Sequence, residues 1–440
     1  MTTAAESELL TRVGPGTPMG ALMRQYWIPA ALSSELKSDA PPVRLMLLGE
    51  KLIAFRDGQG RVGVLDHRCP HRCASLFFGR NEADGLRCIY HGWKFDVDGN
   101  CIDMPNVPPA QDFKSKVHAK AYQVNERNGV VWVYMGEREQ APPMPMIEAT
   151  LMPESEVRVG VVMRECNYLQ ALEGDIDTSH FAFLHAGAID WKTLMPGSTW
   201  YYSLKDKQPE YSVETTDWGT MYGAYRPAEA GSNYWRVAHF MFPFWTIPPD
   251  GDFSTHVVAR AWVPLDDTHC MFFIWVWNHT TPKERLLADG QPIPGVNFGT
   301  FNMLPNTTDW LGRFRLGTNS SNDYMINREA QRDGSSFSGL HNITLEDQAM
   351  TESMGGITDH AWEHLAPSDL MIVRTRRHMA EAARNFVEKG IVPPGVDNPE
   401  TFMGARGGEF VAPDKLKFTD AYAREMQASQ NPTGKLQAAE

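Results

Sequence analysis

The chain has 440 residues, of which 42% are hydrophobic and 22% are charged. This is the composition of a folded globular protein, and it excludes disorder or a collagen-like repeat as a description of the whole chain. The 41 basic and 54 acidic residues give a net charge of −13. Such an acidic chain repels nucleic acid and anionic membranes, so we expect neither as a general partner.

The sequence predicts neither a membrane span nor an export signal. The longest apolar run, Met271 to Trp277, is far shorter than the ~20 residues that cross a bilayer. The first six residues lack the basic start of a signal peptide, and no apolar stretch follows them. Six cysteines in 440 residues are too few for a disulfide scaffold. We therefore expect a cytoplasmic protein.

The first 140 residues predict an entry segment followed by a small all-β unit. Residues 1–40 form the entry segment, with a short helix expected from Pro18 to Trp27. Residues 43–66 alternate apolar runs with glycine-containing turns, which predicts β-hairpins. Short strands continue to Val130–Tyr134, and the proline-rich stretch 141–145 is a stiff connector and a plausible domain boundary.

The remainder of the chain mixes helices with long strands, so the predicted fold class is α+β. Helices are expected over 167–185, from about Leu345 to Gly355, and from an N-cap at Ser368 to Gly390. The polar tail after Asp420 is expected to fray. Four strands are predicted, at 219–226, 234–242, 255–263 and 270–277.

Two cysteine–histidine pairs form the first candidate metal site. Cys69-Pro70-His71 is followed, after sixteen residues, by Cys88-Ile89-Tyr90-His91. Two thiolates and two imidazoles fit either a structural zinc ion or a Rieske [2Fe–2S] cluster. Because each pair is mixed, each loop supplies one ligand to each of two irons, and this favours the cluster. We interpret the nearby Cys73 as a buried small apolar side chain, not as a ligand.

The segment Asp177-x-x-His180-x-x-x-x-His185 is the second candidate metal site. Asp177 and His180 share a face of a helix. His180 and His185 lie about 140° apart around an ideal helix, so both reach one metal only if the helix bends or ends between them. Two histidines and a carboxylate on one side of a metal leave positions free for oxygen, which favours non-haem Fe(II).

These two motifs together resemble the Rieske non-haem iron aromatic ring-hydroxylating oxygenases. The resemblance extends over Cys88-Ile89-Tyr90-His91-Gly92-Trp93-Lys94-Phe95, Leu172 to His180 and Glu346 to Met350, and it is greatest for the phthalate dioxygenase-like group that has no small subunit. It implies that residues 41–145 form a Rieske domain. It also implies that residues 146–440 form a catalytic domain with an antiparallel sheet flanked by helices, on which residues 1–40 pack.

The resemblance assigns roles to individual residues. Cys69, His71, Cys88 and His91 would bind the cluster, and His180 and His185 would bind the mononuclear iron. Asp177 would bridge to a Rieske histidine of a neighbouring subunit. The third iron ligand must come from elsewhere in the chain. Asp347 fits the family pattern best, and the competing acidic residues are Glu346, Glu352 and Asp359.

The implied reaction adds O₂ to an aromatic carboxylate of the phthalate, isophthalate or phenoxybenzoate type, and the expected product is a cis-dihydrodiol. A Rieske monooxygenase or O-demethylase with the same metal centres is the alternative. Members of this family are trimers or stacked trimers. No nicotinamide or flavin fingerprint is present, so an NADH-dependent reductase carrying flavin and an iron–sulfur cluster is the expected partner.

A carboxylate substrate in an acidic protein needs a local cation, ideally the forked guanidinium of an arginine. The strands predicted between residues 219 and 263 carry three arginines, and a lysine precedes them. The candidates for binding the substrate carboxylate are therefore Arg226, Arg236, Arg260 and Lys207.

Overall fold

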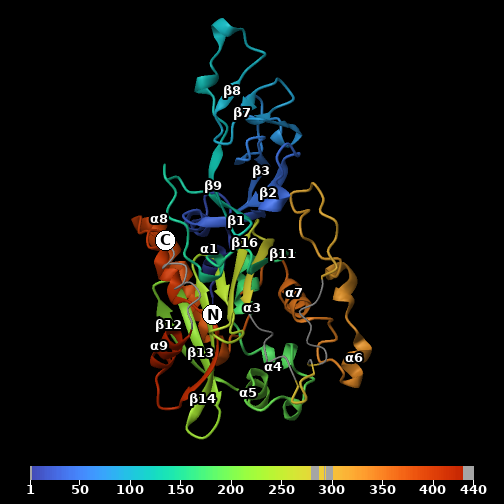
Figure 1. The fold of residues 1–440 in the computed structure, drawn as a ribbon, viewed down its shortest axis with the longest axis vertical. Coiled ribbons are helices and arrows are strands. Elements are labelled where there is room, and N and C mark those ends of the chain that lie inside the picture. The colour runs from blue at the N-terminus through green and yellow to red at the C-terminus, as the bar shows by residue number, and fades with distance from the viewer. Residues whose placement is uncertain (1, 279–286, 292, 294–300, 430–440) are drawn as a thin grey trace.

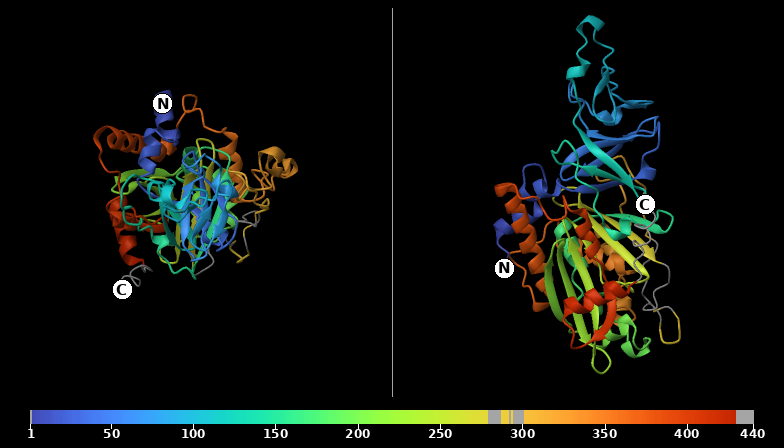
Figure 2. Two further views of the ribbon diagram at one scale, coloured as in Figure 1. Left: turned by 90° about the horizontal axis from the view of Figure 1, so that it is seen from above. Right: turned by 60° about the vertical axis from the view of Figure 1, so that its left-hand side comes forward.

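The computed structural model describes residues 2–278, 287–291, 293 and 301–429. The molecule is elongated, with a small all-β part at one end and a larger α+β part at the other (Figures 1 and 2). The fold class predicted from the sequence is thus confirmed. Across the described residues, no helix combines the length and the apolar character that a membrane span requires.

The small part consists of two antiparallel sheets. A six-stranded sheet has the order β1-β10-β9-β4-β3-β2, and a four-stranded sheet has the order β5-β6-β7-β8. The strands are β1 (Trp27–Leu32), β2 (Val43–Leu47), β3 (Glu50–Arg56), β4 (Val62–Asp66), β5 (Arg80–Glu82), β6 (Gly85–Arg87), β7 (Lys94–Phe95), β8 (Cys101–Asp103), β9 (Ala121–Arg127) and β10 (Val130–Tyr134).

The large part is built on one antiparallel sheet of long strands, with the order β11-β17-β16-β15-β14-β13-β12, and β18 pairs with β14. The four strands predicted here are all present, as β13, β14, β16 and β17. The bounds are β11 (Val157–Arg164), β12 (Glu210–Thr216), β13 (Gly219–Pro227), β14 (Ser232–Met241), β15 (Trp245–Ile247), β16 (His256–Pro264), β17 (Cys270–Asn278) and β18 (Gly408–Pro413).

Helices lie on both sides of this sheet. In Figure 1 the long helix α8 runs along one side, and the segment with α6 and α7 lies on the other. The helices are α1 (Ala4–Thr11), α2 (Pro18–Met23), α3 (Tyr168–Asp175), α4 (Phe181–Leu184), α5 (Thr199–Lys205), α6 (Arg328–Asp333), α7 (Ile343–Ser353), α8 (Leu370–Lys389) and α9 (Phe418–Ala428).

A cluster of three fully buried tryptophans joins the two parts. The ring of Trp132, from β10, stacks on that of Trp245, from β15, with centroids 5.7 Å apart. The Trp275 ring, from β17, lies 5.8 Å from Trp132 and 5.2 Å from Trp245. Aromatic side chains bury more apolar surface than any others, so this cluster fixes the small part on the end of the large sheet.

The N-terminal segment divides between the two parts. Helices α1 and α2 pack against α8 of the large part. The predicted helix ends at Met23, however, and Trp27–Leu32 forms β1, which pairs with β10 in the six-stranded sheet. Apolar side chains at every position of Trp27–Ala31 are buried, and this favours a covered strand over a helix.

Three further sequence predictions need correction. The helix predicted over 167–185 is interrupted: α3 ends at Asp175 and α4 begins at Phe181. Ser368 is not the N-cap of α8, because a 3₁₀ turn over Pro367–Asp369 runs directly into the helix. Residues after Asp420 do not fray up to Ala428, because α9 buries Phe418 and Tyr422 against the large sheet. Residues 430–440 lie outside the described part.

Candidate metal centres and substrate cavity

The two cysteine–histidine loops have the same backbone shape. In the first, the amide of Cys69 donates to the carbonyl of Ala74 at 2.8 Å, and the amide of Cys73 donates to that of Cys69 at 2.8 Å. In the second, Cys88 donates to Trp93 at 2.8 Å and Gly92 donates to Cys88 at 3.0 Å. The loops follow β4 and β6, so two neighbouring turns present equivalent ligands.

This repeated shape corrects the prediction for Cys73. The fifth residue of each loop is left-handed, with φ of 59° at Cys73 and 80° at Gly92. Cys73 occupies the position that glycine occupies in the second loop, and its side chain is exposed to solvent rather than buried. Cys69 and Cys88 are buried, whereas Cys73 is not, so Cys73 is not grouped with the candidate cluster ligands.

The side chains of the two loops fit a cluster with one inner and one outer metal. Cys69 and Cys88 are buried, and the rings of His71 and His91 meet with centroids 4.3 Å apart. Burial, together with the nearby Cys88 sulfur, raises the pKa of Cys69 to about 12, so a thiolate there requires a bound cation. Burial and the neighbouring His91 ring lower the pKa of His71, which favours the neutral imidazole that binds metals.

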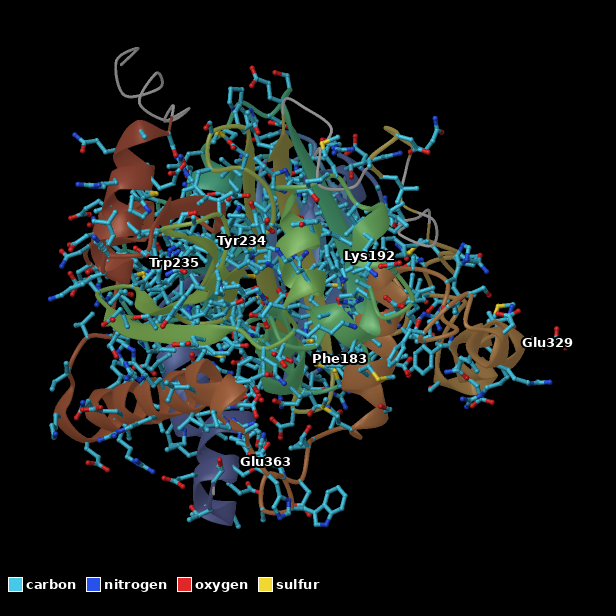
Figure 3. All side chains as sticks on the ribbon, turned by 90° about the horizontal axis from the view of Figure 1, so that it is seen from below. Phe183, Lys192, Tyr234, Trp235, Glu329 and Glu363 are labelled. Carbon is cyan, nitrogen blue, oxygen red and sulfur yellow. The ribbon has the colours of Figure 1, made fainter. Side chains whose placement is uncertain are left out.

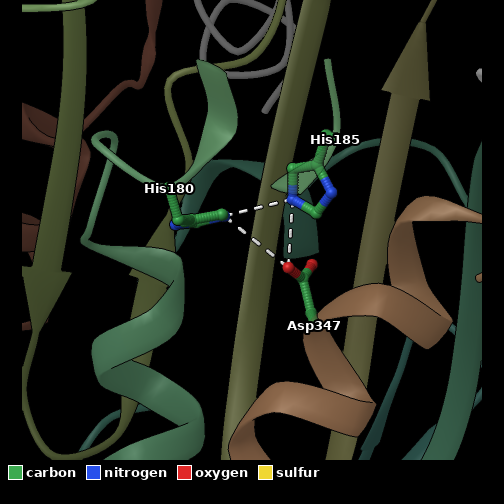
Figure 4. A group of neighbouring side chains, drawn as sticks. All are labelled: His180, His185 and Asp347. Atoms are coloured by element: carbon green, nitrogen blue, oxygen red, sulfur yellow. Dashed lines mark hydrogen bonds and ion pairs between the residues drawn. The ribbon is translucent and has the colours of Figure 1, made fainter. Parts of the chain in front are cut away.

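His180, His185 and Asp347 converge on one point (Figure 4). The Nε2 atoms of the two histidines are 3.1 Å apart. The Oδ1 atom of Asp347 lies 3.0 Å from Nε2 of His185 and 3.6 Å from Nε2 of His180. Three such atoms, with the remaining sides free of further His, Cys, Asp or Glu ligands among the described residues, match a facial triad for non-haem iron.

The local fold explains how two histidines five residues apart reach one point. Asp177 interrupts the helix with a turn in which its Oδ1 accepts the amide of Ser179 at 2.7 Å. The interruption therefore comes before His180, not between the histidines as predicted. His180 and His185 then flank the single helical turn α4, one at each end.

Each histidine is held by a second carboxylate through its other ring nitrogen. Nδ1 of His180 is 3.2 Å from Oδ2 of Asp177, and Nδ1 of His185 is 2.6 Å from Oε2 of Glu346. The other oxygen of Glu346 accepts the hydroxyl of Ser338. Carboxylates in this position fix the tautomer of the ring and increase its basicity as a ligand.

The charges of the three groups reinforce one another. Burial alone raises the pKa of Asp347, but the adjacent His185 and His180 outweigh it and bring that pKa to about 2. Burial lowers the pKa of His185, but Asp347 and Glu346 outweigh it and raise that pKa to about 9. A metal cation would replace the proton on His185, so metal binding at neutral pH releases a proton.

The other acidic competitors for the third ligand position lie elsewhere. Glu346 is a partner of His185, as described. Glu352 accepts the hydroxyl of Tyr324 at 2.6 Å and the amide of Glu165 at 2.9 Å. Asp359 is exposed and accepts the amide of Ala361.

A cavity of about 700 Å³ adjoins the triad, with His180 and Asp347 in its wall. Residues of strands β11, β16 and β17, which we call its floor, and of α3 and α7 line it, and most of the lining is apolar. Its volume falls within the range of pockets that bind small organic molecules. The apolar floor residues are Val162, Val258, Trp262, Phe272, Ile274 and Val276.

Of the four predicted carboxylate-binding residues, Arg260 alone lines this cavity. Arg226 is buried elsewhere and donates to the carbonyl of Asp206 at 2.6 Å. Arg236 lines a smaller adjoining cavity and donates to the hydroxyl of Thr178 at 2.9 Å. Lys207 lies over the ring of Phe183, and Phe183 lies on the face opposite the small domain (Figure 3).

Sequence reasoning missed several polar residues of the cavity wall, above all Arg158, Arg164 and His256. Arg158 and Arg164 lie on β11, a strand that the sequence analysis did not predict. The valines at alternate positions from Val157 to Val161 were the available signal for a strand. Glu346 was considered only as a metal ligand, and its role as the partner of His185 depends on tertiary contact.

Comparison with known proteins identifies the family. The Rieske [2Fe-2S] domain profile matches residues 26–122, and the profile described as LigXa C-terminal domain like matches residues 133–401. The 3-chlorobenzoate-3,4-dioxygenase oxygenase subunit of Comamonas testosteroni is 48% identical over 429 residues, which are 97% of this chain and 99% of that protein. The phthalate 4,5-dioxygenase oxygenase subunit of Pseudomonas putida is 38% identical over 88% of this chain and 87% of its own length.

Solved structures share the fold. Dicamba monooxygenase bound to dicamba superposes with a TM-score of 0.55 at 18% identity, over 84% of this chain and 100% of that one. The chain therefore belongs to the Rieske ring-hydroxylating oxygenases of the phthalate dioxygenase-like group. Its cofactors are a Rieske [2Fe–2S] cluster and a mononuclear iron. Oxygenases of this family act on aromatic substrates with O₂ and a separate electron-transfer reductase.

The triad predicts a selective loss of iron. Asp347→Ala should reduce the iron content from about three to about two atoms per chain, because the two irons of the cluster are held elsewhere. The visible spectrum of the cluster should be unchanged. Iron analysis together with absorption spectroscopy measures both, and Asp359→Ala, an exposed acidic residue on the same late segment, should retain all the iron.

The hydrogen bond between Glu346 and His185 predicts a graded effect on iron affinity. Glu346→Gln keeps an acceptor for Nδ1 but removes the charge, so Fe(II) should bind about 10-fold more weakly, and Glu346→Ala should weaken it about 100-fold. Competition with an Fe(II) chelator gives the affinities. Glu352→Gln, which changes another buried carboxylate of α7, should leave Fe(II) affinity within about twofold; a similar loss there would point to general damage to the helix.

Proposed function

We propose that this chain is the terminal oxygenase of a dioxygenase system that adds O₂ to an aromatic carboxylate and yields a cis-dihydrodiol. The observation that carries the proposal is one cavity whose wall contains two members of the histidine–aspartate triad, a mainly apolar floor and arginines, of which Arg164 is buried. An aryl ring fits the apolar floor, and a carboxylate needs a cation. The relative at 48% identity, named for 3-chlorobenzoate, supports the same substrate class.

In this proposal, some residues bind the two metal groups and others orient the histidine ligands. His180, His185 and Asp347 hold the mononuclear iron at the edge of the cavity, and Cys69, His71, Cys88 and His91 hold the cluster. When bound, the two groups supply electrons and the activation of O₂. Asp177 and Glu346 keep the proton on Nδ1 of each iron-binding histidine, so that Nε2 faces the metal.

The shape of the chain supports a proposal that electrons pass between subunits. The β7–β8 end of the small domain and the α4–α7 region lie far apart along the longest axis of the molecule (Figure 1). We therefore propose a homotrimer or a stacked hexamer, in which the cluster of one subunit meets the iron of the next. Asp177, already bonded to His180, would accept a second hydrogen bond from a Rieske histidine of the neighbour. Exposed Ile89 and Tyr90, 61% and 55% accessible beside His91, would be covered in that contact.

The proposed enzyme also needs an electron donor, and its reaction has one alternative. We expect electrons from NADH through a reductase with flavin and an iron–sulfur cluster, because family members depend on a separate reductase. The alternative reaction is monooxygenation or O-demethylation of an aromatic acid. The fold shared with dicamba monooxygenase is compatible with it, so the product must distinguish the two.

Product analysis with labelled O₂ tests the reaction. The enzyme, supplied with a generic reductase and NADH, should convert 3-chlorobenzoate or a benzene dicarboxylate to a dihydrodiol containing two labelled oxygens. One labelled oxygen, or formaldehyde from a methoxybenzoate, would instead assign a monooxygenase. Mass spectrometry of the products measures the outcome, and absence of any oxidised aromatic acid would contradict the proposal.

Substitution of Asp177 tests the proposed link between the centres. Asp177→Asn nearly preserves the shape of the side chain but removes its charge, so turnover should fall by about 100-fold or more while the Rieske spectrum persists. Single-turnover reduction and oxidation of the cluster measure the transfer step. Asp190→Asn, an exposed site near α4, serves as the control, and unimpaired turnover in Asp177→Asn would exclude a bridging role.

A further inference from the structure

The polar groups of the substrate cavity are unevenly balanced in charge. Four aspartates line the wall, and the charge that each arginine there can offer to a ligand depends on the carboxylates that already pair with it. The aspartates are Asp175, Asp177, Asp250 and Asp347. The arginines are Arg158, Arg164 and Arg260. Arg158 already has an interaction partner. The remaining candidates for binding an anion are therefore Arg164 and Arg260.

The charge of Arg260 is already matched. Its Nη1 donates to Oδ1 of Asp175, a side chain that is itself 7% exposed. The other oxygen of Asp175 accepts the hydroxyl of Thr246 at 2.6 Å and the indole N–H of Trp262 at 2.9 Å. Both oxygens of Asp175 thus have partners, and Asp175 holds Arg260 as one half of a partly buried ion pair with little net charge.

Arg164 is a buried cation of a different kind. It is 2% exposed, and within the described part of the chain it has no ion-pair partner. Its Nη1 makes a long contact of 3.4 Å with the carbonyl of Thr344, and its Nε is buried without a hydrogen-bond partner. Because an uncompensated charge is costly to bury, an arginine in this state is suited to receive an anion.

The surroundings of Arg164 place that anion beside an aromatic-binding floor. The guanidinium lies 5.7 Å from the ring centroid of Trp262 and 5.8 Å from that of Phe272. Thr344, which it contacts, is three residues before Asp347 on α7, so both face the same side of that helix. The anion-binding end and the iron-binding end therefore share one wall of the cavity.

We propose that Arg164 binds the carboxylate of the substrate and that the enzyme selects aromatic monocarboxylates, while Asp175 holds Arg260 as a structural part of the wall. This inference rests on the proposed function. One arginine without a carboxylate partner matches one substrate carboxylate. A second carboxylate on the ring would find no further arginine available, because Arg260 is matched by Asp175 and Arg158 already has a partner, and this disfavours phthalates.

Equilibrium binding to the full-length holoenzyme, kept anaerobic, tests the assignment. Titration calorimetry compares 3-chlorobenzoate, phthalate and the neutral isostere 3-chlorobenzamide. The wild-type protein should bind 3-chlorobenzoate at least about tenfold more tightly than phthalate. Arg164→Met should weaken 3-chlorobenzoate by at least about tenfold but change 3-chlorobenzamide by less than about twofold, because only the charge-assisted hydrogen bonds are lost.

Further variants keep the test decisive. Arg164→Lys retains the charge without the fork and should bind 3-chlorobenzoate with intermediate affinity, which also covers the case in which Arg164→Met does not fold. Arg226→Met changes an equally buried arginine outside the cavity and should bind as the wild type does. The double variant Arg260→Met/Asp175→Asn removes both members of the ion pair and should weaken 3-chlorobenzoate and 3-chlorobenzamide alike.

The outcomes separate this inference from the proposed function. Unchanged 3-chlorobenzoate affinity in the Arg164 variants, or equal losses for the acid and the amide, would overturn the role of Arg164. A loss specific to the acid in the double variant would assign the carboxylate to Arg260 instead. Tighter binding of phthalate than of 3-chlorobenzoate by the wild type would overturn the monocarboxylate preference. If the wild type neither binds nor oxidises any of these acids, the proposed function itself fails.

Discussion

Two imidazole nitrogens and a carboxylate oxygen meet at separations of 3.0 to 3.6 Å, and such a group is stable only around a positive charge. Other elements of the large domain position these three side chains. An Asx turn at Asp177 interrupts the helix before His180, so the single turn of α4 presents both histidines from its ends. Helix α7 then brings Asp347 to the same point from 162 residues further along the chain.

Carboxylates surround this point in two distinct roles. Asp177 and Glu346 act through the histidine rings and fix their orientation. Asp175, two residues before Asp177, instead anchors Arg260 of the cavity wall. Because both aspartates belong to one short segment at the C-terminal end of α3, the geometry of the substrate cavity and that of the iron site are mechanically connected. Such shared support is what keeps a reacting ring at a fixed distance from a metal.

The architecture separates the two metal centres within one chain and joins the domains rigidly. The tryptophan cluster of Trp132, Trp245 and Trp275 fixes the small domain at one end of the large sheet. A hinge that brought the cluster of a chain down to its own iron would have to break this buried contact. The proposed transfer to the iron of another subunit would not require such a hinge, and the exposed apolar residues beside His91 lie where the proposed contact would cover them.

The sequence by itself determined the family, the cofactors and the long strands, because these depend on short spacings and on local periodicity. Cys-x-His, Cys-x-x-His and Asp-x-x-His-x-x-x-x-His can each be recognised within a single loop or turn. Asp347 was preferred among four acidic residues by resemblance, and the fold brings its side chain to the two histidines.

Only the tertiary structure decided which charges are paired. Arg226, Arg236 and Arg260 look equivalent in the sequence, yet Arg226 donates to a carbonyl, whereas Arg236 and Arg260 form ion pairs with Glu409 and Asp175 from distant segments. Arg164 gave no signal, because its importance lies in having no carboxylate within ion-pair distance among the described residues, and the sequence does not encode such a lack locally. Burial, strand register and long-range contacts set the electrostatics of a cavity, and these arise only once the chain has folded.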